Sequence, residues 1–311
     1  RRGIAQHARG GRGILVVTGE PDSGKTALCR RLTSRALSGR ELHWVPPPDD
    51  GAADVEVFRR RLSEVTGVSG SAHEIVSTIP ERSVLVIEDV ELWRERSEHG
   101  LAVIDLLIEL IEAHAGRVLF LLEMGSLAFE LVNRFRPLAD HALAVVECGP
   151  LPAHALKDIV TLRHGSTGIT FSLDGTPESE LSEWRLARLF SQHFDYSRGL
   201  VGTALTSWIT HVEEGDDRTI TIRPPSRRDR EVLDRLRADW TALLVQLLLH
   251  KRMTRERLVR VADLEGRDLD RQLDALRRMG LVKESRQGVL RVDRFITHAL
   301  VERLRERKVI P

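Results

Sequence analysis

The chain has 311 residues, of which 41% are hydrophobic and 30% charged, as in ordinary folded proteins. This length favours about two domains of roughly 100–200 residues and allows sizeable cores without disulfide or metal support. The most apolar stretch, residues 101–111, is interrupted by Asp105 and Glu109, and no run of ~18 apolar residues indicates a membrane span. Two cysteines, Cys29 and Cys148, exclude a disulfide framework and predict packing roles in a reducing cytoplasm.

The net charge is +1, but charge is distributed unevenly along the chain. Residues 226–311 contain 22 Lys and Arg against 14 Asp and Glu, whereas residues 1–225 contain 25 against 32. An acidic front and a basic back indicate two units with different partners. The chain begins at Arg1 and not at Met, so we expect a piece of a longer protein.

Residues 1–150 alternate short apolar strands with helical segments. Strands are expected at 13–18, 41–45, 83–87, 117–122 and 142–146. Helices are expected at 25–37, 52–65, 71–78, 99–114 and 126–134. Strands separated by helices form βαβ units, so this region predicts an α/β fold with a parallel sheet covered on both faces.

Two further domains are expected after Pro150. Residues 151–225 predict a small helical lid subdomain, with helices at 152–163, 178–194 and 197–212 and a short strand near 219–223. Residues 226–311 predict a winged helix-turn-helix, with helices at 227–249, 253–262 and 267–279, a hairpin at 281–292 and a last helix at 293–307. The boundary between these two domains is expected at the Pro-Pro pair 224–225.

A phosphate-binding motif follows the first expected strand and opens the first expected helix. Eight consecutive residues match G-x-x-x-x-G-K-[ST], namely Gly19, Glu20, Pro21, Asp22, Ser23, Gly24, Lys25 and Thr26. The glycines let backbone N–H groups turn toward phosphates, and the helix start adds its dipole. Lys25 is expected to reach the β- and γ-phosphates, while the Thr26 hydroxyl binds Mg²⁺. The sequence therefore predicts a nucleoside triphosphate site with magnesium.

The third expected strand ends in two carboxylates, Glu88 and Asp89. A P-loop needs an acid on a neighbouring strand to hold magnesium, and by position this acid is Glu88, with Asp89 orienting the attacking water. Their lengths are reversed relative to the commoner Asp-then-Glu order, and a displacement of ~1 Å can cost about a hundredfold in rate. We therefore expect nucleotide binding with slow or impaired turnover.

The P-loop, the acids at 88–89, the boundary near Pro150 and the C-terminal pattern together resemble AAA+ and signal-transduction (STAND-type) ATPases. The chain is most similar to the branch with a helical lid and a winged helix, as in origin-recognition initiators and transposon-associated bacterial ATPases. The resemblance covers nearly all of the chain, although only the P-loop is highly specific. It implies ATP as the nucleotide.

At some positions this chain has a different residue from the one that the resemblance implies. A polar sensor, often Asn, normally follows the fourth strand, where this chain has Glu123 and Ser126. The lid arginine that reaches the phosphates falls at Gly202, and Arg198 is the expected substitute. Such departures favour a slow switch over a fast motor.

Arginine fingers acting in trans usually lie near the end of the helix after the fourth strand, which makes Arg134 and Arg136 catalytic candidates. The alternative is that both are surface residues at a helix C-terminus.

The helix expected at 267–279 mixes basic and acidic residues, namely Arg267, Arg271, Arg277, Arg278, Asp268, Asp270 and Asp274. Acids on a reading helix face phosphates unfavourably, which favours protein docking or autoinhibition over base readout. The excess of basic residues over 226–311 keeps DNA as the alternative partner.

We therefore expect an ATP- and Mg²⁺-dependent regulatory switch whose nucleotide state sets the winged-helix position or self-association. A protein partner or an upstream domain is expected to receive the signal. Three alternatives remain: a DNA-loading or transposition-type ATPase, a non-catalytic nucleotide-binding scaffold, and the regulatory part of a larger defence or membrane protein.

Overall fold

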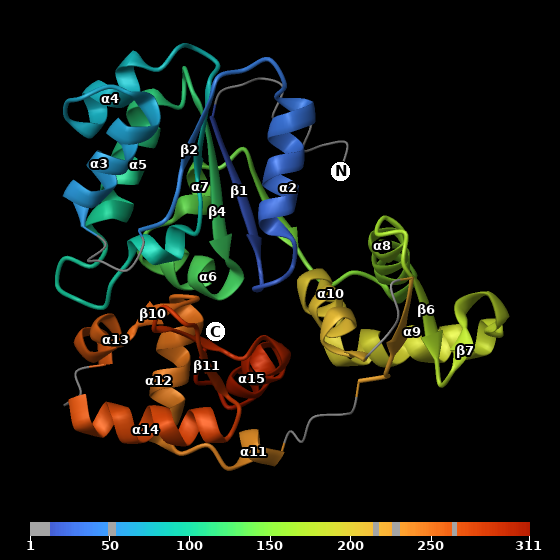
Figure 1. Ribbon diagram of the computed structural model, residues 1–311. Coiled ribbons are helices and arrows are strands. Elements are labelled where there is room, and N and C mark those ends of the chain that lie inside the picture. The colour runs from blue at the N-terminus through green and yellow to red at the C-terminus, as the bar shows by residue number, and fades with distance from the viewer. Residues whose placement is uncertain (1–12, 49–53, 214–217, 226–230, 263–265) are drawn as a thin grey trace. The chain divides into compact units, whose positions relative to one another are not determined.

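The computed structural model describes residues 13–48, 54–213, 218–225, 231–262 and 266–311 (Figure 1). Its chain divides into two compact units by internal contacts. Unit 1 comprises Arg1–Pro21, Lys25–Cys148 and Arg235–Pro311, and unit 2 comprises Asp22–Gly24 and Gly149–Asp234. The C-terminal segment is thus grouped with the α/β core in a single unit.

A parallel five-stranded sheet in the order β2-β3-β4-β1-β5 forms the centre of unit 1. Its strands are β1 (Gly13–Gly19), β2 (Leu42–Val45), β3 (Val84–Ile87), β4 (Leu119–Gly125) and β5 (Ala144–Cys148). The predicted α/β P-loop fold is confirmed. Gly19 lies opposite Gly125, and Ile87 lies opposite Leu122, so the carboxyl ends of β1, β3 and β4 meet at one edge. This edge holds the residues expected to bind nucleotide.

Helices cover both faces of this sheet (Figure 1). They are α2 (Lys25–Arg31), continued by a π-helix η1 (Leu32–Ala36), α3 (Val55–Thr66), α4 (Ala72–Thr78), α5 (Ala102–His114), α6 (Ser126–Phe135) and α7 (Leu138–His141), with a 3₁₀ turn η2 (Val90–Trp93) after β3. Alternate residues of β1 enter two cores, Ile14 and Val16 on one face, Leu15 and Val17 on the other. This explains why the strand reads as a continuous apolar run. The first two residues of the helix predicted at 52–65 lie outside the described residues.

Unit 2 contains the three predicted helices and an unpredicted sheet. The helices are α8 (Ala153–Gly165), α9 (Glu183–Ser197) and α10 (Val201–Thr210), and a 3₁₀ turn η3 (Glu178–Glu180) precedes α9. The sheet has the order β7-β6-β9-β8, with β6 (Thr170–Leu173), β7 (Thr176–Pro177), β8 (Val212–Glu213) and β9 (Thr219–Ile222). Strands β6 and β9 pair in parallel although they are far apart in the sequence. The strand predicted near 219–223 corresponds to β9, whereas β6 was not predicted, because such short strands gain stability mainly from pairing.

The C-terminal module, defined here as residues 235–311, follows the short helix α11 (Glu231–Asp234). It contains α12 (Ala238–Leu249), β10 (Met253–Thr254), α13 (Arg255–Ala262), α14 (Gly266–Arg278), β11 (Val282–Glu284), β12 (Val289–Val292) and α15 (Arg294–Glu306), with an antiparallel sheet β10-β12-β11. Helix 227–249 is predicted as one element, but α11 and α12 are separate, and residues 227–230 lie outside the described residues. Among the described helices, none has the length and apolar character needed to cross a bilayer.

A buried arginine joins the C-terminal module to the α/β core. The Arg257 side chain is only 3% exposed, and its guanidinium donates to the carbonyl oxygens of Leu92 and Arg94 at 2.9 Å each. It also pairs with Glu95 at 3.2 Å. Because buried carbonyl groups need hydrogen-bond partners, this side chain ties α13 to the chain that follows β3.

Replacing Arg257 with Met should therefore destabilise unit 1 by about 3–5 kcal/mol, because two buried carbonyl groups and Glu95 would be left without their cationic partner. Arg260→Gln is the matched control: Arg260 pairs with the same Glu95 at 3.4 Å, but its side chain is 50% exposed. The control should cost at most about 1 kcal/mol. Urea unfolding of the whole chain measures both, and equal losses in the two variants would contradict the role of Arg257.

Candidate nucleotide site

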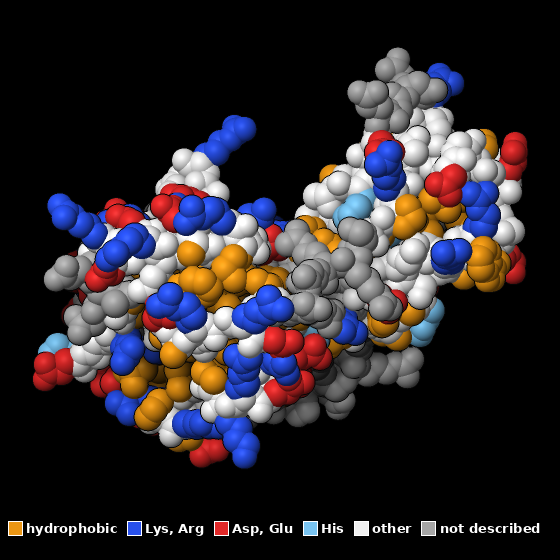
Figure 2. All heavy atoms as spheres, turned by 90° about the horizontal axis from the view of Figure 1, so that it is seen from below, with side chains coloured by type: hydrophobic (Ala, Val, Ile, Leu, Met, Phe, Trp, Pro, Cys, Tyr) orange, Lys and Arg blue, Asp and Glu red, His pale blue; other side chains and the backbone are white. Residues whose placement is uncertain are grey.

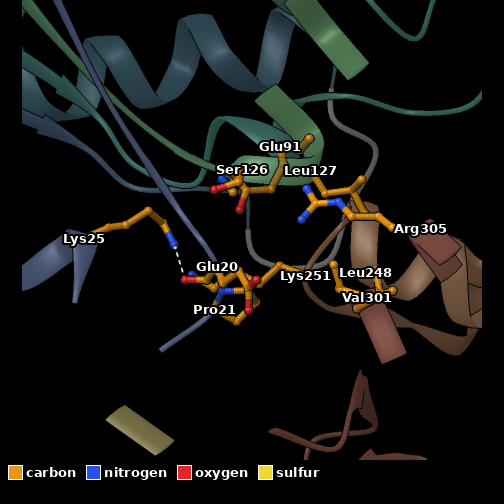
Figure 3. Close-up of a pocket in the computed structure, with 12 residues that line it drawn as sticks. Glu20, Pro21, Lys25, Glu91, Ser126, Leu127, Leu248, Lys251, Val301 and Arg305 are labelled. Atoms are coloured by element: carbon orange, nitrogen blue, oxygen red, sulfur yellow. Dashed lines mark hydrogen bonds between the residues drawn. The ribbon is translucent and has the colours of Figure 1, made fainter. Parts of the chain in front are cut away.

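The P-loop curls around the ammonium group of Lys25. Strand β1 ends at Gly19 and α2 begins at Lys25, and between them Gly24 has a φ of 95°, which favours glycine. Lys25 is 5% exposed, and its Nζ donates to the carbonyl oxygen of Gly19 at 3.0 Å. It also donates to the carbonyl oxygen of Glu20 at 3.1 Å (Figure 3). A cation is thus fixed at the start of a helix, where an anion is bound most favourably.

Some buried oxygen atoms beside the loop lack hydrogen-bond partners in the described part of the chain and could bind a ligand. Thr26 Oγ1 donates to Glu123 Oε1 at 2.7 Å. Among the described residues, neither Ser23 Oγ nor Glu123 Oε2 finds a hydrogen-bond partner, although both atoms are buried. An unsatisfied buried polar atom costs about 1–3 kcal/mol, and a phosphate or a hydrated metal would remove that cost. The loop therefore fits a nucleotide with magnesium.

The carboxyl group of Glu123 accepts a hydrogen bond from the P-loop threonine, Thr26. Glu123 ends the apolar part of β4 and is 1% exposed. Burial raises the pKa of Glu123 above its ordinary value, and the hydrogen bond from Thr26 opposes that rise. Sequence reasoning considered Glu123 as a candidate for the sensor position in place of the usual Asn, and the structure places it against the hydroxyl expected to bind magnesium.

The two acids after β3 occupy different surroundings. Glu88 is partly buried, and its backbone N–H donates to the Val45 carbonyl at 3.2 Å, which extends the pairing of β3 with β2. Asp89 is 8% exposed and begins the turn η2 with a φ of 45° and a ψ of 54°. Left-handed backbone at a non-glycine residue costs about 1–3 kcal/mol and is concentrated at functional sites.

A third acid, Glu91, was missed by sequence reasoning. Glu91 lies within η2 and is 2% exposed, and its Oε2 accepts a hydrogen bond from the backbone N–H of Gly125 at 3.1 Å. Burial, assisted by the negative charge of Asp89, raises the pKa of Glu91 to about 7. The residue therefore connects η2 to the start of α6. Its position in a loop gave no signal, because a lone acid there is usually solvated.

A lysine from the C-terminal module reaches the site and was also missed. Lys251 Nζ lies 2.5 Å from Asp89 Oδ1, and Lys251 likewise has left-handed backbone, with a φ of 59°. Burial alone would lower the pKa of Lys251, but attraction to Asp89 and Glu91 outweighs it, and the pKa is raised. The two residues are separated by 162 positions, so no local pattern could pair them.

A pocket next to the P-loop is lined by both parts of unit 1 (Figure 3). From the core come Glu20, Pro21, Lys25, Glu91 and Gly125 to Ala128, and from the C-terminal module come Leu248, Lys251, Val301 and Arg305. A second polar contact crosses between them nearby, where His298 Nδ1 lies 2.8 Å from Glu20 Oε2. The C-terminal module thus contacts the P-loop itself as well as the acid Asp89.

The candidate arginine fingers lie at the far end of α6 from the pocket. Arg134 is exposed in the last turn of this helix. Arg136 follows the helix and forms two hydrogen bonds with the carboxylate of Asp105 on α5. A helix of this length spans about 15 Å, so neither arginine belongs to the pocket of its own chain. Their role in trans stays a prediction.

The lid residues singled out by the resemblance lie in unit 2. Arg198 is exposed and ends α9 with a φ of 55°, and its role stays a prediction. The N–H of Gly202 donates to the carbonyl of Asp22, the P-loop residue grouped with this unit, at 2.8 Å. A Cβ at position 202 would lie 2.9 Å from the Asp22 Cβ. This close approach explains why glycine stands where an arginine was expected.

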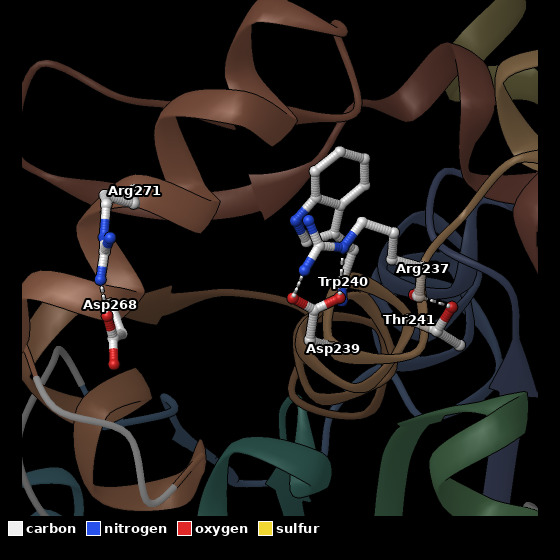
Figure 4. A network of polar contacts seen from close by, with 6 residues as sticks. All are labelled: Arg237, Asp239, Trp240, Thr241, Asp268 and Arg271. Carbon is white, nitrogen blue, oxygen red and sulfur yellow. Dashed lines mark hydrogen bonds and ion pairs between the residues drawn. The ribbon is translucent and has the colours of Figure 1, made fainter.

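Arginines of α14 are paired with acids of the same module. Arg271 pairs with Asp268 (Figure 4), and Arg277 pairs with Asp274 and with Glu284 of β11. The face in Figure 2 shows basic side chains interspersed with hydrophobic and acidic ones. Arginines paired in this way attract phosphates less strongly than unpaired ones.

Comparison with known proteins identifies the family. Residues 8–180 match the model of the AAA domain family. The chain belongs to this family, and nucleotide binding follows from membership. A search of the curated proteins finds no match.

Solved structures of similar fold include the ADP form of the ORC2 protein of Aeropyrum pernix, with 12% identity, a TM-score of 0.50, and 98% of this chain and 93% of that chain covered. The ORC1 protein of the same organism in complex with DNA has 16% identity, a TM-score of 0.49, and coverage of 97% and 92%. A STAND protein with a tetratricopeptide repeat sensor from Pyrococcus horikoshii has 14% identity, a TM-score of 0.42, and coverage of 97% and 42%. At such identities the likeness to ORC2 concerns the fold alone.

A buried histidine makes unit 1 sensitive to acid. His250 is fully buried, and its Nε2 lies 3.3 Å from Arg94 Nη2. Burial, then the charges of Arg94 and Arg257, lower its pKa from 6.5 to about 2. The folded chain therefore binds fewer protons than the unfolded chain below pH ~6.5, and stability is lost as the pH falls.

We predict that the free energy of unfolding falls by up to about 1.4 kcal/mol per pH unit below ~6.5, and that His250→Gln reduces this slope because glutamine does not titrate. Urea titrations of both proteins at pH 7.5, 6.5 and 5.5 provide the comparison. An identical slope in the two proteins would show that other groups cause the acid sensitivity.

Proposed function

We propose that this chain is a regulatory switch that binds ATP and Mg²⁺ at the P-loop, turns ATP over slowly, and uses the nucleotide state to set the position of its C-terminal module or its self-association. The observation that carries the proposal is the contact of that module with the phosphate site, where Lys251 engages Asp89 at 2.5 Å. Because Asp89 is paired with a lysine of the C-terminal module, its availability for chemistry depends on the position of that module.

Each P-loop residue has a definite task in this proposal. Backbone N–H groups of the loop and Lys25 bind the β- and γ-phosphates, as in P-loop proteins generally. The Thr26 hydroxyl, with Glu88 and Glu123, would hold the metal, which when bound would neutralise phosphate charge. Asp89 orients the attacking water once it is released from Lys251. A buried site excludes bulk water and strengthens each of these interactions.

Control by docking also accounts for the mixed charge of the module. His298 against Glu20 and Lys251 against Asp89 give the module two polar contacts with the site. The pairing of α14 arginines with acids favours a protein surface as its other partner. We therefore place protein contact and self-association ahead of DNA as the output of the switch.

Removing the P-loop cation tests nucleotide binding. Lys25→Ala should abolish binding of a fluorescent ATP analogue, with at least about a hundredfold loss of affinity, because the phosphates lose a buried charge-assisted partner. Lys283→Ala is the control, since Lys283 lies in β11 and its side chain is 57% exposed. Unchanged affinity in the Lys25 variant would refute the site.

Turnover, mass and partner dependence test the switch itself. Phosphate release should be slow in the presence of ATP and Mg²⁺, should not rise steeply with DNA, and should accompany a nucleotide-dependent change in mass or protease sensitivity. Asp89→Asn should retain nucleotide affinity but lower the remaining turnover by about 10²-fold or more, the range for losing a group that orients or deprotonates water. Strong stimulation by DNA, with steep salt dependence, would instead support a DNA-loading ATPase.

A further inference from the structure

Lys251 faces a cluster of buried acids in the core. Three carboxyl groups attract its ammonium, those of Asp89, Glu91 and Glu123. Each of these residues is at most 8% exposed, and the P-loop cation Lys25 is buried near them. Carboxyl groups buried together can ionise only where cations lie nearby, because an uncompensated buried charge is strongly destabilising.

The backbone directs Lys251 into this cluster. Lys251 lies in the tight turn between α12 and β10, directly after the fully buried His250, and adopts left-handed backbone. Arg257 fixes the same part of the module to the chain after β3. The side chain lines the pocket together with Lys25 and Glu91, as Figure 3 shows.

An ammonium group and a hydrated divalent cation compete for the same oxygen atoms of a carboxylate. Both need its oxygen lone pairs, and both gain from the surrounding negative charge. With Lys251 Nζ at 2.5 Å, Asp89 Oδ1 is already engaged by a donor. A second cation placed beside it would also be repelled by the lysine charge.

We propose that Lys251 is an internal cation that competes with magnesium for the negative charge of the Asp89, Glu91 and Glu123 cluster, so that docking of the C-terminal module and binding of the metal–nucleotide complex compete. This inference rests on the proposed function and specifies its coupling: the metal is the part of the ligand that the module opposes. Nucleotide without metal leaves Lys251 on Asp89, and nucleotide with metal releases it.

Fluorescent ADP binding to the full chain, measured over a series of free Mg²⁺ concentrations, tests the competition without relying on turnover. Lys251→Met removes the charge and keeps most of the apolar stem. It should lower the Mg²⁺ concentration needed for half-maximal enhancement of binding by about tenfold, equivalent to about 1.4 kcal/mol. Lys251→Arg keeps the charge and should resemble the wild type. Arg260→Gln removes a cation from the same module at an exposed ion pair with Glu95, and should leave the Mg²⁺ dependence unchanged.

Amide hydrogen exchange supplies a second readout that requires no variant. In the wild-type chain, ADP with Mg²⁺ should speed exchange over residues 250–262, whereas ADP with EDTA should not. If ADP with Mg²⁺ leaves this exchange unchanged, the inference is overturned even where Lys251→Met does not fold.

The binding outcomes separate the two proposals. A wild-type chain that binds no nucleotide overturns the proposed function and this inference together. A wild-type chain that binds nucleotide, with an unchanged or raised Mg²⁺ requirement in Lys251→Met, overturns the inference alone. A raised requirement would make Lys251 a ligand of the bound phosphates and not a competitor of the metal.

Discussion

The ammonium of Lys251 and the carboxylate of Asp89 meet 2.5 Å apart, and both residues adopt left-handed backbone to do so. Two strained residues facing one another indicate a conformation imposed by the surrounding structure. The constraint behind it is the concentration of buried acids where β3 and β4 end. Glu91 and Glu123 are almost fully buried there, and Lys25 of the P-loop and Lys251 of the C-terminal module favour their charged forms.

This constraint explains why the module and the α/β core form one unit. The apolar cores of the sheet are complete without the module, since helices pack on both faces. Several polar contacts attach the module: Arg257 on two backbone carbonyls, His298 on Glu20 and Lys251 on Asp89. Polar contacts of this kind exchange more readily with a charged ligand than an apolar interface does, which suits a reversible switch.

Departures from the family pattern have local physical causes. Gly202 accommodates the close approach of Asp22, and Glu123 has the Thr26 hydroxyl as its partner. The P-loop of this chain therefore lies beside a cluster of buried carboxyl groups that attracts a lysine of the chain's own C-terminal module.

The sequence by itself determined the parallel α/β fold and located the P-loop, because both depend on short-range order: apolar strands, glycines and Lys25 follow one another directly. It also predicted most helices from their apolar periodicity. Only the tertiary structure decided that β6 pairs with β9, that Glu91 holds the start of α6, and that Lys251 reaches Asp89. These contacts join residues far apart in the chain, and the burial that gives a charge its importance is a property of the packed molecule and not of any local pattern.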